Sequence, residues 1–175
     1  MSGVGEASVH ASAVLVGKRA VLIRGPSGAG KSRLAFDLIL AGRTGQIPLA
    51  VLVGDDRVHL SATGGQLMVR PAPQLSGLIE IRGLGIRRCP FIAEAVLGVV
   101  VDLEAADAER LPPPEKLKTR IQGVELPRIP VESGFSALPL VVAFLTTTEG
   151  TDSPELSTDC LKGIGNHMRP SIATE

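Results

Sequence analysis

The segment 25–32, GPSGAGKS, constrains this chain more than any other part of its sequence. It matches the phosphate-binding loop pattern G-x-x-x-x-G-K-[ST] at every fixed position. The apolar run 19–24 before it predicts a strand. The spacing of apolar residues over 34–39 after it predicts an amphipathic helix that ends near Gly42. A strand, a glycine-rich turn and a helix N-terminus in this order predict a site for a nucleoside triphosphate or a similar polyphosphate.

Each residue type in this loop has a physical role. The glycines let backbone N–H groups converge on phosphate oxygens without a Cβ in the way. Lys31 is expected to bring a positive charge to the β- and γ-phosphates, and Ser32 to offer its hydroxyl to Mg²⁺. The loop alone leaves the reaction open, because many NTPases and kinases share it. The expected nucleotide-binding residues are Gly25, Pro26, Ser27, Gly28, Ala29, Gly30, Lys31 and Ser32.

The composition excludes several classes of function. The 175 residues suit one domain, and 18 basic and 18 acidic side chains give a net charge of zero. A neutral chain with no Trp, no Tyr and four Phe is not expected to bind nucleic acid by charge or by base stacking. No apolar run approaches the roughly 20 residues of a membrane span, and the N-terminus lacks a secretory pattern. We therefore expect a cytoplasmic protein with Cys89 and Cys160 as free thiols.

Turn signals divide the rest of the chain into short strands and one closing helix. A strand over 9–16 is expected to pair with 19–24 through the turn Gly17-Lys18, which sets His10 opposite Gly25. The sequence from Thr147 is polar and without periodicity, so we expect a catalytic domain over 1–146 and a flexible tail over 147–175. Further strands are expected over 49–53, 58–62, 66–70, 78–81, 95–103 and 127–131, and the helix over 138–145.

Acidic residues end two of these strands. A phosphoryl-transfer site needs a carboxylate near the metal and a group that orients the nucleophile. Asp55 and Asp56 follow the strand 49–53, and Asp102 lies near the end of the strand 95–103. Adjacent aspartates alternate in direction, so one can face the phosphates while the other meets the metal or the backbone. The alternatives are a solvated turn for the pair and a strand cap for Asp102.

Three further side chains are candidates for the site. Glu80 and Arg82 project to the same face of the pattern LIEIRG, as a metal ligand and a phosphate clamp or as a simple salt bridge. His10, opposite Gly25, is expected at the mouth of the phosphate loop, although a lone histidine is usually structural.

These motifs together resemble the catalytic C-terminal domain of the HPr kinase/phosphorylase family. The matching segments are VHASAVLVGKRAVLIRGPSGAGKS, LVGDDRV and IEIRGLGIRR, in the family's order and spacing. The resemblance extends over about residues 9–131 and is to the short, single-domain type. It implies an α/β fold that contains a P-loop, with a carboxykinase-like mixed sheet, flanking helices and β-hairpins.

The resemblance implies a serine protein kinase that uses ATP and Mg²⁺ to phosphorylate HPr or an HPr-like phosphocarrier protein. Carried over by position, Asp55 would be the base for the serine proton, with Asp56 in support. His10 and Arg82 would lie at the phosphate site with Lys31, and Ser32 and Glu80 would bind Mg²⁺. For Asp102 the resemblance implies a structural role. Family members also tend to form hexamers, so the resemblance implies a homo-oligomer.

Two departures from the family pattern bear on activity. Arg33 stands where an acidic residue is typical, and the segment 129–138 contains Glu132 but no arginine. The missing arginine argues against the reverse reaction, in which inorganic phosphate releases pyrophosphate. The alternatives to a protein kinase are a P-loop small-molecule kinase, a carboxykinase-like enzyme, and a nucleotide-binding regulatory module without turnover.

Overall fold

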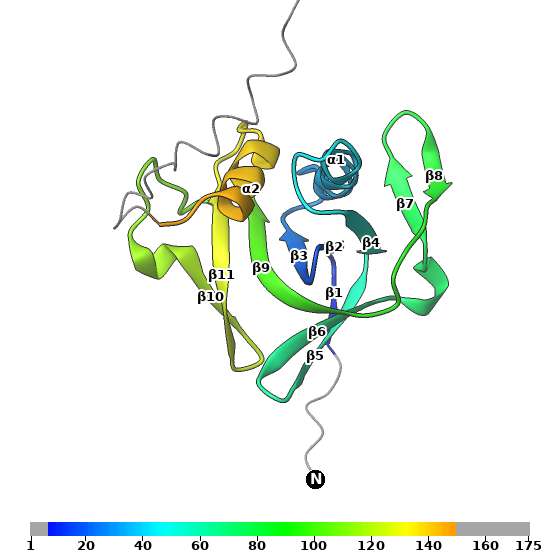
Figure 1. The fold of residues 1–175 in the computed structure, drawn as a ribbon, viewed down its shortest axis with the longest axis horizontal. Helices are drawn as coiled ribbons and strands as arrows, with labels where there is room; N and C mark the ends of the chain where they lie inside the picture. Colours follow the sequence, from blue (N-terminus) through cyan, green and yellow to red (C-terminus); the bar gives the residue numbers. More distant parts are fainter. Residues whose placement is uncertain (1–6, 150–175) are drawn as a thin grey trace, which may run out of the picture.

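The computed structural model describes residues 7–149, and nine of their strands form one mixed sheet (Figure 1). A separate two-stranded sheet stands beside helix α1. The strands are β1 Ala7–Val9, β2 Ser12–Val16, β3 Arg19–Arg24, β4 Ala50–Gly54, β5 Val58–Thr63, β6 Gln66–Pro71, β7 Leu78–Ile81, β8 Gly85–Arg88, β9 Ala95–Leu103, β10 Lys118–Ile121 and β11 Val124–Val131. The helices are α1 Lys31–Arg43 and α2 Ala137–Thr146, with short 3₁₀ turns η1 Pro73–Leu75 and η2 Pro114–Leu117.

Strand β9 holds the large sheet together. Its neighbour β3 lies parallel to it, and β2 and β4 follow on the far side of β3. On its other edge β9 pairs first with β6 and then, further along, with β11. Because nine residues are long enough for two partners in succession, β9 connects the ribbon β1-β5-β6 and the hairpin β10-β11 to the centre (Figure 1).

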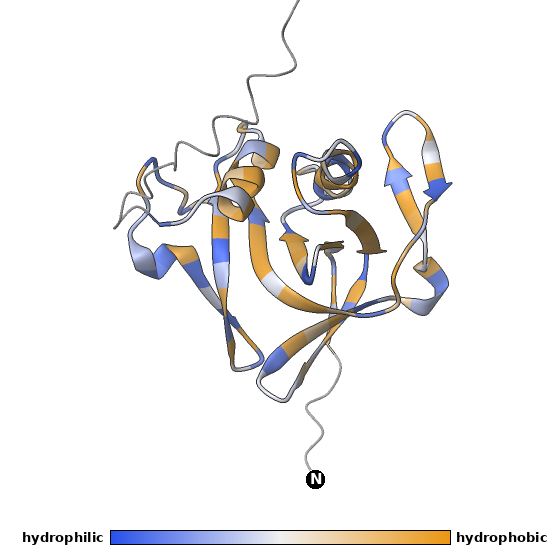
Figure 2. Cartoon of the chain, in the orientation of Figure 1, coloured by the Kyte–Doolittle hydropathy of each residue, from blue (hydrophilic) through white to orange (hydrophobic). Residues whose placement is uncertain are grey.

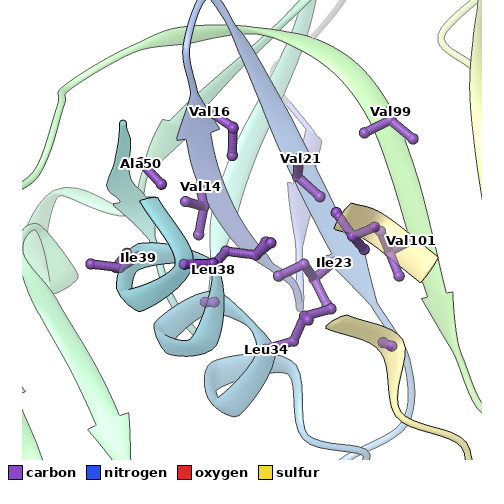
Figure 3. Packing of buried hydrophobic residues seen from close by; sticks show 14 of the residues in the cluster. Val14, Val16, Val21, Ile23, Leu34, Leu38, Ile39, Ala50, Val99 and Val101 are labelled. Atoms are coloured by element: carbon purple, nitrogen blue, oxygen red, sulfur yellow. The ribbon is translucent and has the colours of Figure 1, made fainter. Parts of the chain in front are cut away.

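Each face of the central strands has its own aliphatic core. Helices α1 and α2 cover one face, where Leu34 and Leu38 pack against Val14, Val21 and other apolar residues of β2, β3 and β9 (Figure 3). The curled strands β5, β6 and β11 enclose the other face. Strands β3 and β9 are largely apolar, whereas polar residues gather in the outer hairpins (Figure 2). This agrees with the nearly aromatic-free composition, since aliphatic side chains fill both cores.

The expected hairpin of β2 and β3 is confirmed, but it is shorter than predicted. Residues whose numbers add up to 35 face each other from Val16 and Arg19 to Ser12 and Ile23, and Gly17 has the positive φ of +61° that the turn requires. The single strand over 9–16 was wrong. The chain bends at residue 10, and β1 pairs with β5 instead. His10 is therefore not paired across a ladder with Gly25.

The predicted helix end near Gly42 is confirmed within one residue, but Gly42 is not the residue that stops the helix. Helix α1 continues to Arg43, and the residue with the positive φ is Gly45, at +75°. Gly42 lies where the helix touches β4, and a Cβ there would approach the backbone nitrogen of Ala50 to 2.6 Å. Position 42 therefore requires glycine because helix α1 packs closely against β4 there.

Most other expected elements are confirmed within one to three residues. The hairpin β5-β6 turns at Gly64 and Gly65, both with positive φ, as an I′ turn requires. The strand over 127–131 is the end of the longer β11, and its partner β10 was not predicted. Cys89 forms no disulfide within residues 7–149. Cys160 and residues 150–175 of the expected tail lie outside the described residues. No helix within 7–149 is long and apolar enough to cross a membrane.

Candidate active site

A cavity of about 910 Å³ opens where β3 and β9 end, in front of the N-terminus of α1. This volume is in the range of small-molecule sites. In open α/β sheets ligands bind beyond the carboxyl ends of parallel strands, which is where this cavity lies. The walls come from the phosphate loop, the first turns of α1 and five further segments. The lining residues are His10, residues 27–34, Phe36, Asp37, Asp56, residues 80–82, Leu103 and residues 134–137.

The phosphate loop has the backbone shape of an anion site. Gly25, Gly28 and Gly30 have φ of +152°, +84° and +94°, and Gly30 is the N-cap of α1. The first intrahelical bond in this turn runs from the Leu34 N–H to the Gly30 carbonyl, so the earlier N–H groups have no partner inside the helix. Lys31 is buried, and its Nζ donates to the carbonyls of Gly25 and Pro26, each at 2.9 Å. The loop therefore offers several donors and one full charge to a polyphosphate.

Asp55 is buried behind this loop and does not line the cavity. Its exposed fraction is 3%. Oδ1 accepts hydrogen bonds from Ser12 Oγ at 2.5 Å and Ser32 Oγ at 2.9 Å, and Oδ2 accepts the backbone N–H of Glu80 at 3.0 Å. Both carboxylate oxygens are thus occupied, and the side chain is held between β2, α1 and β7.

Asp56 has the opposite environment. Its side chain is 66% exposed and lies on the cavity wall, where His10 Nε2 is 3.1 Å from Oδ1. Its φ of +65° is uncommon for a residue other than glycine, though aspartate tolerates it better than most. Such a conformation persists where the surrounding structure holds it, often at functional sites. The expectation that the two aspartates face different ways is confirmed.

Glu80 and Arg82 both line the cavity, as their shared face predicted. Glu80 is the third residue of β7, and Arg82 follows in the turn that leads to β8. No ion pair joins Glu80 to Arg82 among the salt bridges of residues 7–149, so the salt-bridge alternative is not supported.

Asp102 is held away from the cavity by two arginines. Arg24 donates to both of its oxygens, at 2.7 and 2.8 Å, and Arg128 donates to Oδ2 at 2.5 Å. Burial alone would raise the pKa of this carboxyl, but the arginine hydrogen bonds and charges outweigh it and hold the pKa below its usual value. Asp102 ties the ends of β3, β9 and β11 together, which is a structural role.

One wall of the cavity was not predicted from the sequence. Residues 134–137, between β11 and α2, line it, and the ring of Phe135 is 68% exposed there. Phe36 and Asp37 of α1 were also missed. The available signal in the sequence was Gly134, which stands between the predicted strand 127–131 and the predicted helix 138–145 and so indicates a loop. In the structure Gly134 has a φ of +84°.

The described oxygen donors fit Mg²⁺ only in combination with a nucleotide. No cluster of three or more His, Cys, Asp or Glu side chains within residues 7–149 is arranged to hold a metal. Mg²⁺ in phosphoryl-transfer sites takes few protein ligands and completes its shell with phosphate oxygens and waters. Ser32, whose hydroxyl hydrogen is directed at Asp55, and Glu80 on the cavity wall match that chemistry.

Fold and site together define a P-loop nucleotide-binding protein with a mixed sheet. The sequence model described as HPr Serine kinase C-terminal domain matches residues 4–150. The chain belongs to this family.

Named relatives agree with this assignment. The chain is 39% identical over 147 residues to the HPr kinase/phosphorylase of Geobacillus thermodenitrificans, and 32% identical over 149 residues to that of Mycoplasma mycoides. Each alignment covers 77% of this chain and 45% of the relative, so the chain spans a little under half the length of these curated relatives.

A solved structure confirms the fold class. The HPr(Ser) kinase/phosphatase from Coxiella burnetii superposes with a TM-score of 0.63 at 26% sequence identity. The match covers 79% of this chain and 93% of that one. The expected P-loop-containing, carboxykinase-like α/β fold is therefore confirmed.

Proposed function

We propose that this chain is the catalytic domain of a protein-serine kinase that uses ATP and Mg²⁺ to phosphorylate an HPr-like phosphocarrier protein. One observation carries the proposal: an exposed carboxylate, Asp56, lies with His10 on the wall of the cavity that the phosphate loop lines. The names of the relatives support HPr as the substrate class. A cytoplasmic location and assembly into a homo-oligomer, a hexamer by family resemblance, belong to the same proposal.

The nucleotide would bind through the loop 25–32. The backbone N–H groups and Lys31 would contact the phosphates, and Ser32 and Glu80 would hold Mg²⁺. When bound, Mg²⁺ neutralises charge on the β- and γ-phosphates. Arg82, on the same wall, would add a second cation for the transferred group.

The geometry favours Asp56 over Asp55 as the proton acceptor. The two carboxylate oxygens of Asp55 already accept three hydrogen bonds, and its burial keeps it from a protein substrate. Asp56 would accept the proton of the substrate serine as the serine oxygen bonds to the γ-phosphorus. The bond from that phosphorus to the bridging oxygen breaks, and ADP leaves. His10, 3.1 Å away, would orient the carboxylate.

Labelling from [γ-³²P]ATP tests both parts of this proposal. We expect the full chain to label an HPr-type protein on serine, and Asp56→Asn to lower the rate by about 10²–10⁴-fold while ATP still binds. Wild-type labelling rates in Asp56→Asn would assign the base elsewhere. A folded wild-type chain that labels no HPr-type protein under varied metals would overturn the kinase proposal itself.

We propose that the reverse reaction is weak in this chain. The cavity wall formed by residues 134–137 contains no cation, and the segment 129–138 contains no arginine. Inorganic phosphate would therefore meet only the cations that the nucleotide site itself provides. Pyrophosphate release from phosphate and the serine-phosphorylated substrate measures this activity.

A further inference from the structure

Only three polar or charged side chains are buried within residues 7–149, and one of them lies outside the proposed nucleotide site. Lys31 and Asp55 belong to the nucleotide site, and the third is Ser12 in β2, with no exposed surface. A buried hydroxyl is unfavourable unless it is hydrogen-bonded. Ser12 Oγ donates to Asp55 Oδ1 at 2.5 Å, across 43 residues of sequence.

The sheet brings these two residues together by an irregularity. Strands β2 and β4 are antiparallel, with Val14 opposite Leu52 but Ala13 opposite Gly54, so β4 contains one extra residue at this point. One step further along the shifted register, Ser12 faces Asp55. Bulges of this kind redirect a side chain next to a site. Here the result is an aspartate directed inward, toward Ser12 and α1.

Asp55 in turn connects the two proposed metal ligands. The same Oδ1 accepts the hydroxyl hydrogen of Ser32, and Oδ2 accepts the backbone N–H of Glu80. Because the Ser32 hydrogen is directed at Asp55, the lone pairs of the Ser32 oxygen remain available for a cation. Partners behind the ligands fix ligand orientation, and their loss typically lowers metal affinity 10- to 100-fold.

We propose that Ser12 is a positioning residue for the Mg²⁺–nucleotide site: it holds Asp55 so that Asp55 orients Ser32 and the start of β7. This inference rests on the proposed nucleotide and Mg²⁺ binding. It does not depend on the identity of the protein substrate. Without the Ser12 hydroxyl, the Asp55 carboxylate keeps the hydrogen bonds from Ser32 and Glu80. It loses the hydrogen bond that ties it to strand β2 of the large sheet.

The test compares ATP affinity with and without Mg²⁺, by calorimetry on the full chain, in wild type and in Ser12→Ala. We expect equal affinity in EDTA and a Mg²⁺-dependent gain in affinity that is roughly tenfold smaller in Ser12→Ala. Ser12→Thr, which keeps the hydroxyl, should recover most of the gain. A titration with Mn²⁺, monitored by electron paramagnetic resonance, measures the affinity of the site for the metal directly.

Two controls separate positioning from general damage. Val14 lies two residues along on the same face of β2 and is equally buried, so Val14→Ala should lower stability and leave the Mg²⁺-dependent gain unchanged. Ser32→Ala should abolish the gain. If Ser12→Ala matches wild type while Ser32→Ala does not, the role of Ser12 is refuted and the site stands. If wild type itself gains nothing from Mg²⁺, the proposed site and this inference fall together.

Discussion

Two adjacent aspartates with the same chemistry have opposite surroundings in this chain. Asp55 is buried and accepts three hydrogen bonds, whereas Asp56 is exposed beside His10. The local sequence predicts that they point in different directions, but it cannot say which one faces solvent. That choice depends on Ser12 and Glu80, residues 43 and 25 positions away from Asp55. At the scale of residues, therefore, contacts distant in sequence decide which carboxylate is buried and which is exposed on the cavity wall.

Two glycines of the phosphate loop should respond differently to a methyl group. A Cβ on Gly25 would come within 2.9 Å of Leu103 Cβ and 3.1 Å of the Leu103 carbonyl oxygen, at a φ of +152°. A Cβ on Gly28 would meet nothing within 4 Å, at a φ of +84°. We expect Gly25→Ala to lower the free energy of unfolding by roughly 3 kcal/mol, because both clash and strain act. Gly28→Ala should lower it by only about 1–2 kcal/mol, from strain alone. Urea unfolding measures both, and equal losses would contradict the packing argument.

At the scale of elements, an ion-pair network joins the strand ends that support the loop. Arg24 is the last residue of β3, directly before Gly25, and its partner Asp102 of β9 also binds Arg128 of β11. Arg128 also donates to both oxygens of Asp107, which lowers the pKa of that carboxyl to about 2. The pKa of Arg128 is raised further above its usual value, chiefly by the hydrogen bonds to Asp107.

This network makes an acid-dependent contribution to stability. Both aspartate pKa values are lower in the folded chain than in the unfolded chain. The stabilisation is therefore complete above about pH 4, the unfolded value, and is lost as pH falls toward 2. We expect Asp102→Asn to lower the free energy of unfolding by about 3 kcal/mol at pH 7, because Arg128 is 13% exposed and loses a charged partner. The difference between wild type and variant should shrink between pH 4 and 2 in urea titrations.

A surface pair on the neighbouring hairpin provides the matched control. Lys118 and Glu125 join β10 to β11 with side chains more than half exposed, and such pairs contribute about 0–1 kcal/mol. Glu125→Gln should therefore have little effect at any pH. A loss as large as that of Asp102→Asn would mean that exposure does not separate the two pairs.

At the scale of the whole molecule, local patterns predicted the elements well and their arrangement poorly. The loop 25–32, the turns at Gly17 and Gly64, and the apolar strand 95–103 are encoded by neighbouring residues, and all were found where expected. The order β1-β5-β6-β9-β3-β2-β4 and the branch to β11 depend on pairings between distant segments. Periodicity carries no information on such pairings. The same limit hid the cavity wall at residues 134–137 and the contact of Ser12 with Asp55.

The predicted boundary between a catalytic domain and a tail belongs to this scale too. Both cores and the whole cavity are built from residues 9–145, and α2 contributes the buried Ala137 and Val141 to the core beside α1. A chain that ends at Glu149 retains all of these contacts. We expect it to unfold within a few degrees of the full chain's melting temperature and to bind ATP with the same affinity.

A chain that ends at Gly134 tests the opposite case, because it removes α2 and uncovers the apolar surface beneath it. Losing two buried side chains and the covering of Val131 and Ile129 should lower the melting temperature by more than 10 °C, since each kcal/mol corresponds to roughly 2–4 °C in a domain of this size. Calorimetric melting of the full chain and of the chains that end at Glu149 and at Gly134 shows where the folded domain ends. If ending the chain at Glu149 is as damaging as ending it at Gly134, residues 150–175 belong to the folded domain and the boundary at 146 is wrong.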